Sequence, residues 1–137
     1  MISQYSEPVP EREASLMNVL QLAYIGDAVW ELIVRSLLVR RGLNVRHMHS
    51  ECIRKVNAHA QAESLRLIAP ELSSVESDLV KRGRNTHTHH PVPKNQSPED
   101  YALATAFEVL IGFLYLTGNH DRILFLSGII LGGDSNG

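Results

Sequence analysis

Two carboxylates stand in the two most apolar stretches of this chain. Asp27 lies within residues 23–34 and Glu108 within residues 101–116, where Ala, Val, Ile, Leu and Phe dominate. An ionised carboxylate in such surroundings is costly unless a cation compensates its charge, and no Lys or Arg stands three or four residues before either acid. We therefore expect the two carboxylates to share a divalent metal ion. The alternative is that each lies at the edge of its apolar stripe and faces water.

The metal that suits this pair is Mg²⁺, with Mn²⁺ as a substitute. Magnesium prefers oxygen ligands and keeps several waters, so one or two carboxylates with phosphate oxygens from a substrate are enough. Such a site hydrolyses a phosphodiester, because the ion activates water and stabilises the leaving oxygen. Asp27 and Glu108 are therefore candidate catalytic and metal-binding residues. Gly26, beside Asp27, allows a neighbouring backbone to approach closely.

The elements that must position these acids are helices. Apolar residues recur at three and four, and no run alternates with period two, which predicts an all-α bundle in a single domain spanning 1–137. A long helix begins near Leu16 and stops at Arg40-Arg41-Gly42, where basic residues and glycine favour a helix end. The remaining expected helices are 45–68, 74–82 with Ser74 as cap, 98–117 after Ser97, and 120–131. We read 1–14 as a leader, 83–97 as a long functional loop and 132–137 as a frayed tail.

Charge is distributed unevenly along the chain. The net charge is −2, but residues 35–94 hold 11 Lys or Arg against 5 Asp or Glu, while the rest holds 2 against 10. Phosphate binding depends on a local cationic face rather than on net charge. This pattern is consistent with an enzyme that holds RNA on a basic surface, although acidic helices with a solvated basic face would give the same numbers.

The segment 81–85 is the most compact basic cluster. Double-stranded RNA is held mainly through phosphates and 2′-hydroxyls, which Arg, Lys, Asn and His side chains can contact. The alternative is a solvated helix end, where basic residues favour the dipole. We also considered zinc for the histidines of 87–90 and for His47 and His49, but no cysteine or second helical pair completes such a site. The candidate RNA-binding residues are Lys81, Arg82, Arg84, Asn85, His87 and Lys94.

Asn57, His59 and Gln61 are polar residues of the expected helix 45–68. They could orient waters of the metal shell or the scissile phosphate, and a solvated helix face explains them equally well. The single cysteine, Cys52, excludes an internal disulfide. No secretory signal or run of about 18 apolar residues is visible. We therefore expect a soluble cytoplasmic protein without a membrane partner.

A surplus of apolar surface predicts association between copies. Trp30, Leu37 and the nearly all-apolar helix 101–116 offer more apolar face than one small bundle needs. We interpret the aromatic residues of these helices as core or subunit interface. The expected assembly is a homodimer.

Three segments carry a resemblance to a known family. Tyr-Ile-Gly-Asp-Ala-Val (24–29) resembles the end of the ribonuclease III signature, residues 106–116 resemble its second catalytic helix, and Lys-Arg-Gly-Arg-Asn (81–85) is similar to an element of the Mini-ribonuclease III family. The segment 19–27 lacks the two glutamates of the full-length signature, and Thr105 stands where its second motif has an aspartate. We expect no double-stranded-RNA-binding domain after residue 137. These departures fit the Mini-ribonuclease III pattern.

This resemblance implies a ribonuclease III-type catalytic domain that acts as a homodimer. It implies a magnesium-dependent endoribonuclease that cuts double-stranded RNA in maturation of large-subunit (23S) ribosomal RNA precursor, with a ribosomal-protein helper among its partners. Thr105 would join Asn57 and Gln61 around the metal shell. One alternative is a catalytically inactive, ribosome-associated RNA-binding module. Another is a helical metal-binding or interaction protein with no RNA partner.

Overall fold

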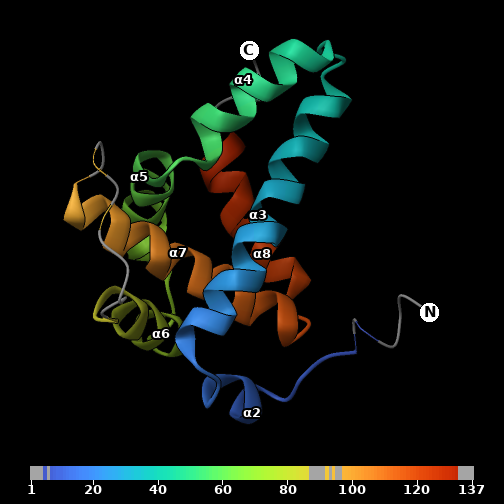
Figure 1. Ribbon diagram of the computed structural model, residues 1–137. Helices are drawn as coiled ribbons and strands as arrows, with labels where there is room; N and C mark the ends of the chain where they lie inside the picture. Colours follow the sequence, from blue (N-terminus) through green and yellow to red (C-terminus); the bar gives the residue numbers. More distant parts are fainter. Residues whose placement is uncertain (1–4, 6, 87–91, 93, 95–96, 133–137) are drawn as a thin grey trace.

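The fold is a bundle of helices, as the apolar periodicity predicts (Figure 1). The computed structural model describes residues 5, 7–86, 92, 94 and 97–132, and this part of the chain contains no strand. The elements are α2 (Glu11–Ser15), α3 (Val19–Arg40), α4 (Val45–Val56), α5 (Ala58–Ile68), the 3₁₀ turn η1 (Ala69–Glu71), α6 (Ser74–Arg84), α7 (Pro98–Leu116) and α8 (His120–Leu131). None of the described helices is long and apolar enough to cross a membrane.

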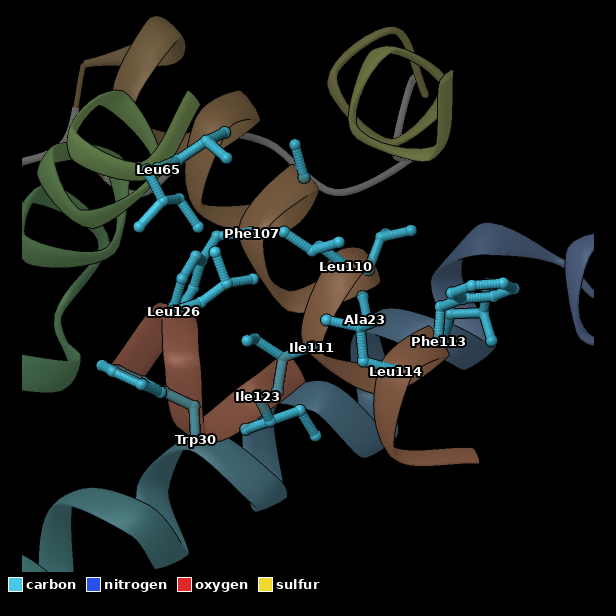
Figure 2. Packing of buried hydrophobic residues seen from close by; sticks show 14 of the residues in the cluster. Ala23, Trp30, Leu65, Phe107, Leu110, Ile111, Phe113, Leu114, Ile123 and Leu126 are labelled. Carbon is cyan, nitrogen blue, oxygen red and sulfur yellow. The ribbon is translucent and has the colours of Figure 1, made fainter. Parts of the chain in front are cut away.

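Helix α7 is the centre of the core, with α3, α5, α6 and α8 packed around it (Figures 1 and 2). Eleven of its 19 residues are buried. The Trp30 ring of α3 meets the Phe107 ring of α7 edge-on, with centroids 5.0 Å apart at 88°, a favourable geometry for two aromatic rings. Trp30 is 1% exposed, so the prediction that Trp30 and α7 supply a free apolar face was wrong at these residues. They fill the core of their own subunit.

The expected helix 45–68 is two helices, α4 and α5, which meet at Asn57. Asn57 has extended backbone dihedrals and ends α4. Its side-chain oxygen accepts a hydrogen bond from the Ala60 amide at 2.8 Å and so begins α5. Asparagine is a strong N-cap because its oxygen satisfies a free amide of the first turn. The break directs α5 onto α7.

Helix α6 differs from its expected bounds at both ends. Its cap is Ser73 rather than Ser74, and Ser73 forms a reciprocal capping box with Glu76. The helix continues to Arg84, so the first two residues of the expected loop 83–97 are helical. Gly83 is buried, and a methyl group there would crowd the Cα atom of Ala106 in α7. Close packing on α7 therefore extends this helix. Residues 11–14 of the expected leader belong to the short helix α2, which ends at Ser15.

Candidate active site

The crossing of α3 and α7 places the two carboxylates together. A methyl group on Gly26 of α3 would overlap the backbone carbonyl of Glu108, and one on Gly112 of α7 would overlap the carbonyl of Leu22. The two backbones thus touch at these glycines, as the position of Gly26 predicted. Because Asp27 follows Gly26 directly, its side chain leaves α3 where α7 presents Glu108.

Asp27 and Glu108 interact through a side-chain hydrogen bond. Glu108 is partly buried and Asp27 is exposed. Burial, followed by the hydrogen bond and the charge of Asp27, raises the pKa of Glu108 to about 8, against a smaller opposing effect of Gln61. A protein environment that disfavours the second negative charge favours either a proton or a cation between two carboxylates.

Gln61 of α5 completes the immediate surroundings of Glu108. It is 3% exposed, and its side chain hydrogen-bonds to Glu108, which favours the ionised form of that carboxyl. The interpretation of Gln61 as part of a solvated helix face is therefore wrong. A buried amide that donates to a carboxylate fixes the direction in which the carboxylate presents its other oxygen.

The other two residues expected around the metal shell have local backbone partners. The Thr105 hydroxyl donates to the Tyr101 carbonyl one turn earlier in α7, at 3.1 Å. The Asn57 side chain caps α5 and also donates to the Arg54 carbonyl at 3.5 Å. These bonds show how both side chains are held, and their contact with a metal shell stays a prediction.

The donor set fits a hard divalent cation. Two carboxylates lie in contact across two helices, one partly buried and one open to solvent. Within the part of the chain that the structure describes, no third His, Cys, Asp or Glu joins them to form a larger ligand cluster. Two carboxylates with open positions for water and phosphate suit Mg²⁺, whereas a closed zinc site uses four protein ligands.

The candidate RNA-binding residues lie at the end of α6. Lys81, Arg82, Arg84 and Asn85 are exposed, and Asn85 ends the helix. Arg82 donates to the Ser15 carbonyl at 2.8 Å, so part of its guanidinium ties α6 to the segment before α3. Lys94 is exposed, and His87 lies outside the described residues. Lys81 and Arg82 also line an open hollow of about 680 Å³ with residues 16–19.

A second ionic cluster, which the sequence analysis missed, joins α5 to the first turn of α7. Asp100 accepts from His59 at 2.8 Å and from Arg66 at 3.2 Å. The hydrogen bond from His59 is the main reason that the pKa of Asp100 lies below its ordinary value. The cluster braces α5, which carries Gln61, against α7, which carries Glu108. No local pattern could reveal it, because 41 residues separate His59 from Asp100.

The raised pKa of Glu108 predicts how stability depends on pH in metal-free protein. The folded state keeps the Glu108 proton up to about pH 8, whereas the unfolded chain loses it near 4.5, the ordinary pKa of a glutamate carboxyl. The free energy of unfolding therefore falls as pH rises between these values. Glu108→Gln should remove this dependence and be more stable than wild type at pH 9 by about 1–3 kcal/mol. The test is the free energy of unfolding in urea, measured with a chelator at pH 5 and pH 9. The same pH dependence for wild type and Glu108→Gln would contradict the prediction.

Comparison with known proteins agrees with this geometry. Residues 20–119 match the model of the family described as Ribonuclease III domain. The chain is 45% identical over 105 residues to Mini-ribonuclease 3 of Symbiobacterium thermophilum, covering 76% of this chain and 80% of that protein. It is 40% identical over 125 residues to Mini-ribonuclease 3 of Gloeobacter violaceus, covering 91% and 85%. A crystal structure of a Fusobacterium nucleatum protein aligns with a TM-score of 0.79 and 30% identity, over 87% of this chain and 95% of the other.

The helical fold and the match over residues 20–119 define a domain of the ribonuclease III type. Within that class, the chain belongs to the Mini-ribonuclease 3 family, and it is an endoribonuclease.

Proposed function

We propose that this endoribonuclease is magnesium-dependent and cuts double-stranded RNA. Its active site would be formed by Asp27 and Glu108. The observation that carries the proposal is the contact between these two carboxylates at the α3–α7 crossing. An RNA-binding module without activity would not need two acids so close together that the pKa of one of them, Glu108, rises to about 8. Mn²⁺, which accepts the same oxygen ligands, should replace Mg²⁺.

The residues of the site divide the work between them. Asp27 and Glu108 would hold the cation, which supplies an activated water and neutralises charge on the scissile phosphate when bound. Gln61 donates to Glu108 and keeps its carboxylate oriented. Glu108 must lose its proton to act as a ligand, so the affinity for metal rises with pH toward about 8.

The cellular role is the finer part of the proposal. The resemblance of segments 24–29, 81–85 and 106–116 to Mini-ribonuclease III supports large-subunit (23S) ribosomal RNA precursor as the substrate, a ribosomal-protein helper as a partner and the cytoplasm as the location. The relatives named Mini-ribonuclease 3 support the same enzyme class.

A cleavage assay on a structured RNA duplex tests the activity. We expect cuts in the duplex with Mg²⁺, none with a chelator, and no cleavage of a single strand of the same sequence. Purified protein that binds the duplex but leaves it intact at saturating Mg²⁺ would favour the inactive, ribosome-associated alternative instead.

The exposed end of α6 supports phosphate binding and gives a second prediction. Replacing Lys81, Arg82 and Arg84 by Ala should weaken duplex binding about equally across RNA sequences, because phosphate contacts carry no base information. The salt dependence of affinity should flatten by a slope of roughly 0.7–0.9 per lost contact. Cleavage at saturating RNA should persist, since none of the three contacts the carboxylate pair.

The control for this variant is Arg12→Ala, which removes an exposed cation from α2. Affinity measured at four or more salt concentrations compares the proteins. Identical slopes for wild type and the triple variant would contradict RNA binding by α6. A loss of stability in the triple variant would be traced to Arg82, because Lys81→Ala with Arg84→Ala leaves the bond to Ser15 intact.

We also propose that the enzyme is a homodimer, through the outer face of α3 rather than through Trp30 and α7. One outer stripe of α3 is apolar and open to solvent: Leu20 is 40%, Tyr24 is 84% and Leu32 is 65% exposed, and these positions recur at multiples of four. An exposed apolar stripe on a helix whose opposite face packs on α7 is typical of an interface. A two-fold dimer matches the two-fold symmetry of a duplex with antiparallel strands.

Light scattering at micromolar concentration tests the dimer. Wild type should give twice the chain mass of 15.3 kDa, and Tyr24→Glu with Leu32→Glu should give the chain mass itself, because two charges would enter the interface. Leu124→Glu, at another exposed leucine (67%), is the matched control and should leave the dimer intact. A monomeric wild type would refute the proposal.

A further inference from the structure

A cavity of about 430 Å³ opens between α5, α6 and α7. It is separate from the carboxylate pair. Leu103 lines it and precedes Glu108 by five residues, which places the two side chains about 140° apart around α7. The proposed cation site does not use this cavity, although Lys81 and Arg84, which line it, are also proposed to hold RNA phosphates.

The floor of the cavity is apolar. Leu65 and Leu103 line it and are 3% and 8% exposed, and the half-buried Leu72 and Val80 form its walls. Ligand sites of a few hundred Å³ usually combine such an apolar lining with a small number of polar groups. The floor suits a flat, weakly polar ring.

The rim of the cavity is cationic. Arg66, Lys81 and Arg84 line it. Arg66 is already paired with Glu63 at 2.6 Å and Asp100 at 3.2 Å. The positive charge that a ligand could contact therefore comes from Lys81 and Arg84 of α6. Ser77, Val80, Lys81 and Arg84 recur at three and four, so α6 presents them on one face.

Among the described residues that line the cavity, one is an acid. Glu99 lies 3.8 Å from Arg84, and both side chains are more than half exposed. An exposed pair at that distance contributes little, and a phosphate can replace it. Arginine binds phosphate with two parallel hydrogen bonds, and lysine adds a point charge.

We propose that this cavity binds a nucleotide unit, with the base on the Leu65 and Leu103 floor and the phosphate between Lys81 and Arg84. Two sources offer the same chemistry: a free nucleotide, or an unpaired nucleotide next to the duplex of the RNA substrate. The second source rests on the proposed function, and the first does not. In either case the nucleotide engages Lys81 and Arg84, so a free nucleotide would compete with RNA for the end of α6.

Titration calorimetry with GMP, guanosine and inorganic phosphate tests the site itself. GMP should bind at least about tenfold more tightly than phosphate or guanosine, because it uses both the floor and the rim. Ala69→Glu places a carboxylate in the cavity at an exposed lining position and should weaken GMP binding by about tenfold or more. Leu67→Glu, at an exposed position of α5 that does not line the cavity, is the matched control and should bind GMP like wild type.

Thermal unfolding shows whether Ala69→Glu folds. If that variant unfolds at a lower temperature, Lys81→Glu reverses a rim charge from an exposed position of α6 and should weaken GMP binding in the same way. GMP that binds no more tightly than phosphate, or equally well to wild type and both variants, would overturn the proposal.

Two RNA duplexes distinguish the sources, with Glu108→Gln as the background so that binding is measured without cleavage. If the RNA supplies the nucleotide, a duplex with an unpaired end should bind more tightly than a blunt one, and Ala69→Glu should abolish the difference. If a free nucleotide is the ligand, the two duplexes should bind alike while GMP still binds. Cleavage of the blunt duplex by wild type reports separately on the proposed function.

Discussion

Asp27→Asn and Glu108→Gln should each reduce cleavage of an RNA duplex by roughly 10³-fold or more, equivalent to about 4 kcal/mol of transition-state stabilisation. Each change keeps the size of the side chain and removes one of two carboxylates that meet at the α3–α7 crossing. The remaining carboxylate cannot hold the cation that generates the attacking water. Single-turnover cleavage at saturating Mg²⁺ and RNA measures the effect.

Binding and folding should survive these substitutions. Duplex affinity should stay within about threefold of wild type, because phosphate contacts come from the basic surface. Unfolding in metal-free buffer should show no loss of stability for Glu108→Gln, since that carboxyl is destabilised by burial and by Asp27. Glu13→Gln, which removes an exposed acid from α2, is the control and should cleave normally. Near-normal turnover by either site variant would refute the catalytic assignment.

The sequence predicted that Asp27 and Glu108 lie together, but it did not predict which residues surround them. The cost of Glu108 is local, because this acid stands among apolar neighbours in its own helix, and that cost requires a compensating partner. Asp27 is exposed, so for Asp27 the alternative of a carboxylate that faces water holds. The burial of Gln61 is a tertiary property. A polar residue on α5 becomes part of the site only because α5 packs on α7.

The division of 45–68 had a weaker signal. Apolar periodicity continues across Asn57, so a single helix satisfied the pattern. Asparagine is a strong cap and a poor interior helix residue. The free energy of this preference is small compared with that of packing α5 against α7. At α6 the cap is Ser73 rather than Ser74, and here the signal was local. The capping box with Glu76 could have been read from the Ser-x-x-Glu spacing.

The prediction of association illustrates a different limit. An apolar stretch indicates that its residues are buried. It does not indicate whether the subunit's own core or a second copy covers them. Trp30 and α7 are apolar because they fill the subunit's own core, whereas the exposed stripe with Tyr24 and Leu32 belongs to the same long helix α3. The positions of α7, α4 and α6, which pack on α3, determine which face of α3 is covered.

The close contact between α3 and α7 predicts that a substitution at Gly26 has a large effect on stability. Gly26→Ala should lower the free energy of unfolding by about 3 kcal/mol or more, as overpacking of backbone against backbone forces two helices apart. The added methyl group would overlap the Glu108 carbonyl and crowd the Gly112 amide, and neither can move without its helix. Alanine's better helix propensity, worth about 1 kcal/mol, offsets only part of this.

The same substitution should reduce cleavage, because the displacement separates Asp27 from Glu108. A misplacement of about 1 Å can cost a catalytic site about 10²-fold. The matched control is Gly128→Ala, since Gly128 lies inside α8 with no atom within 4 Å of the added methyl group. That variant should gain about 0.5–1 kcal/mol from the lower entropy of the unfolded chain and cleave normally. Urea unfolding and single-turnover cleavage compare the two alanines, and a Gly26→Ala enzyme as stable and active as Gly128→Ala would show that the α3–α7 contact does not position the carboxylate pair.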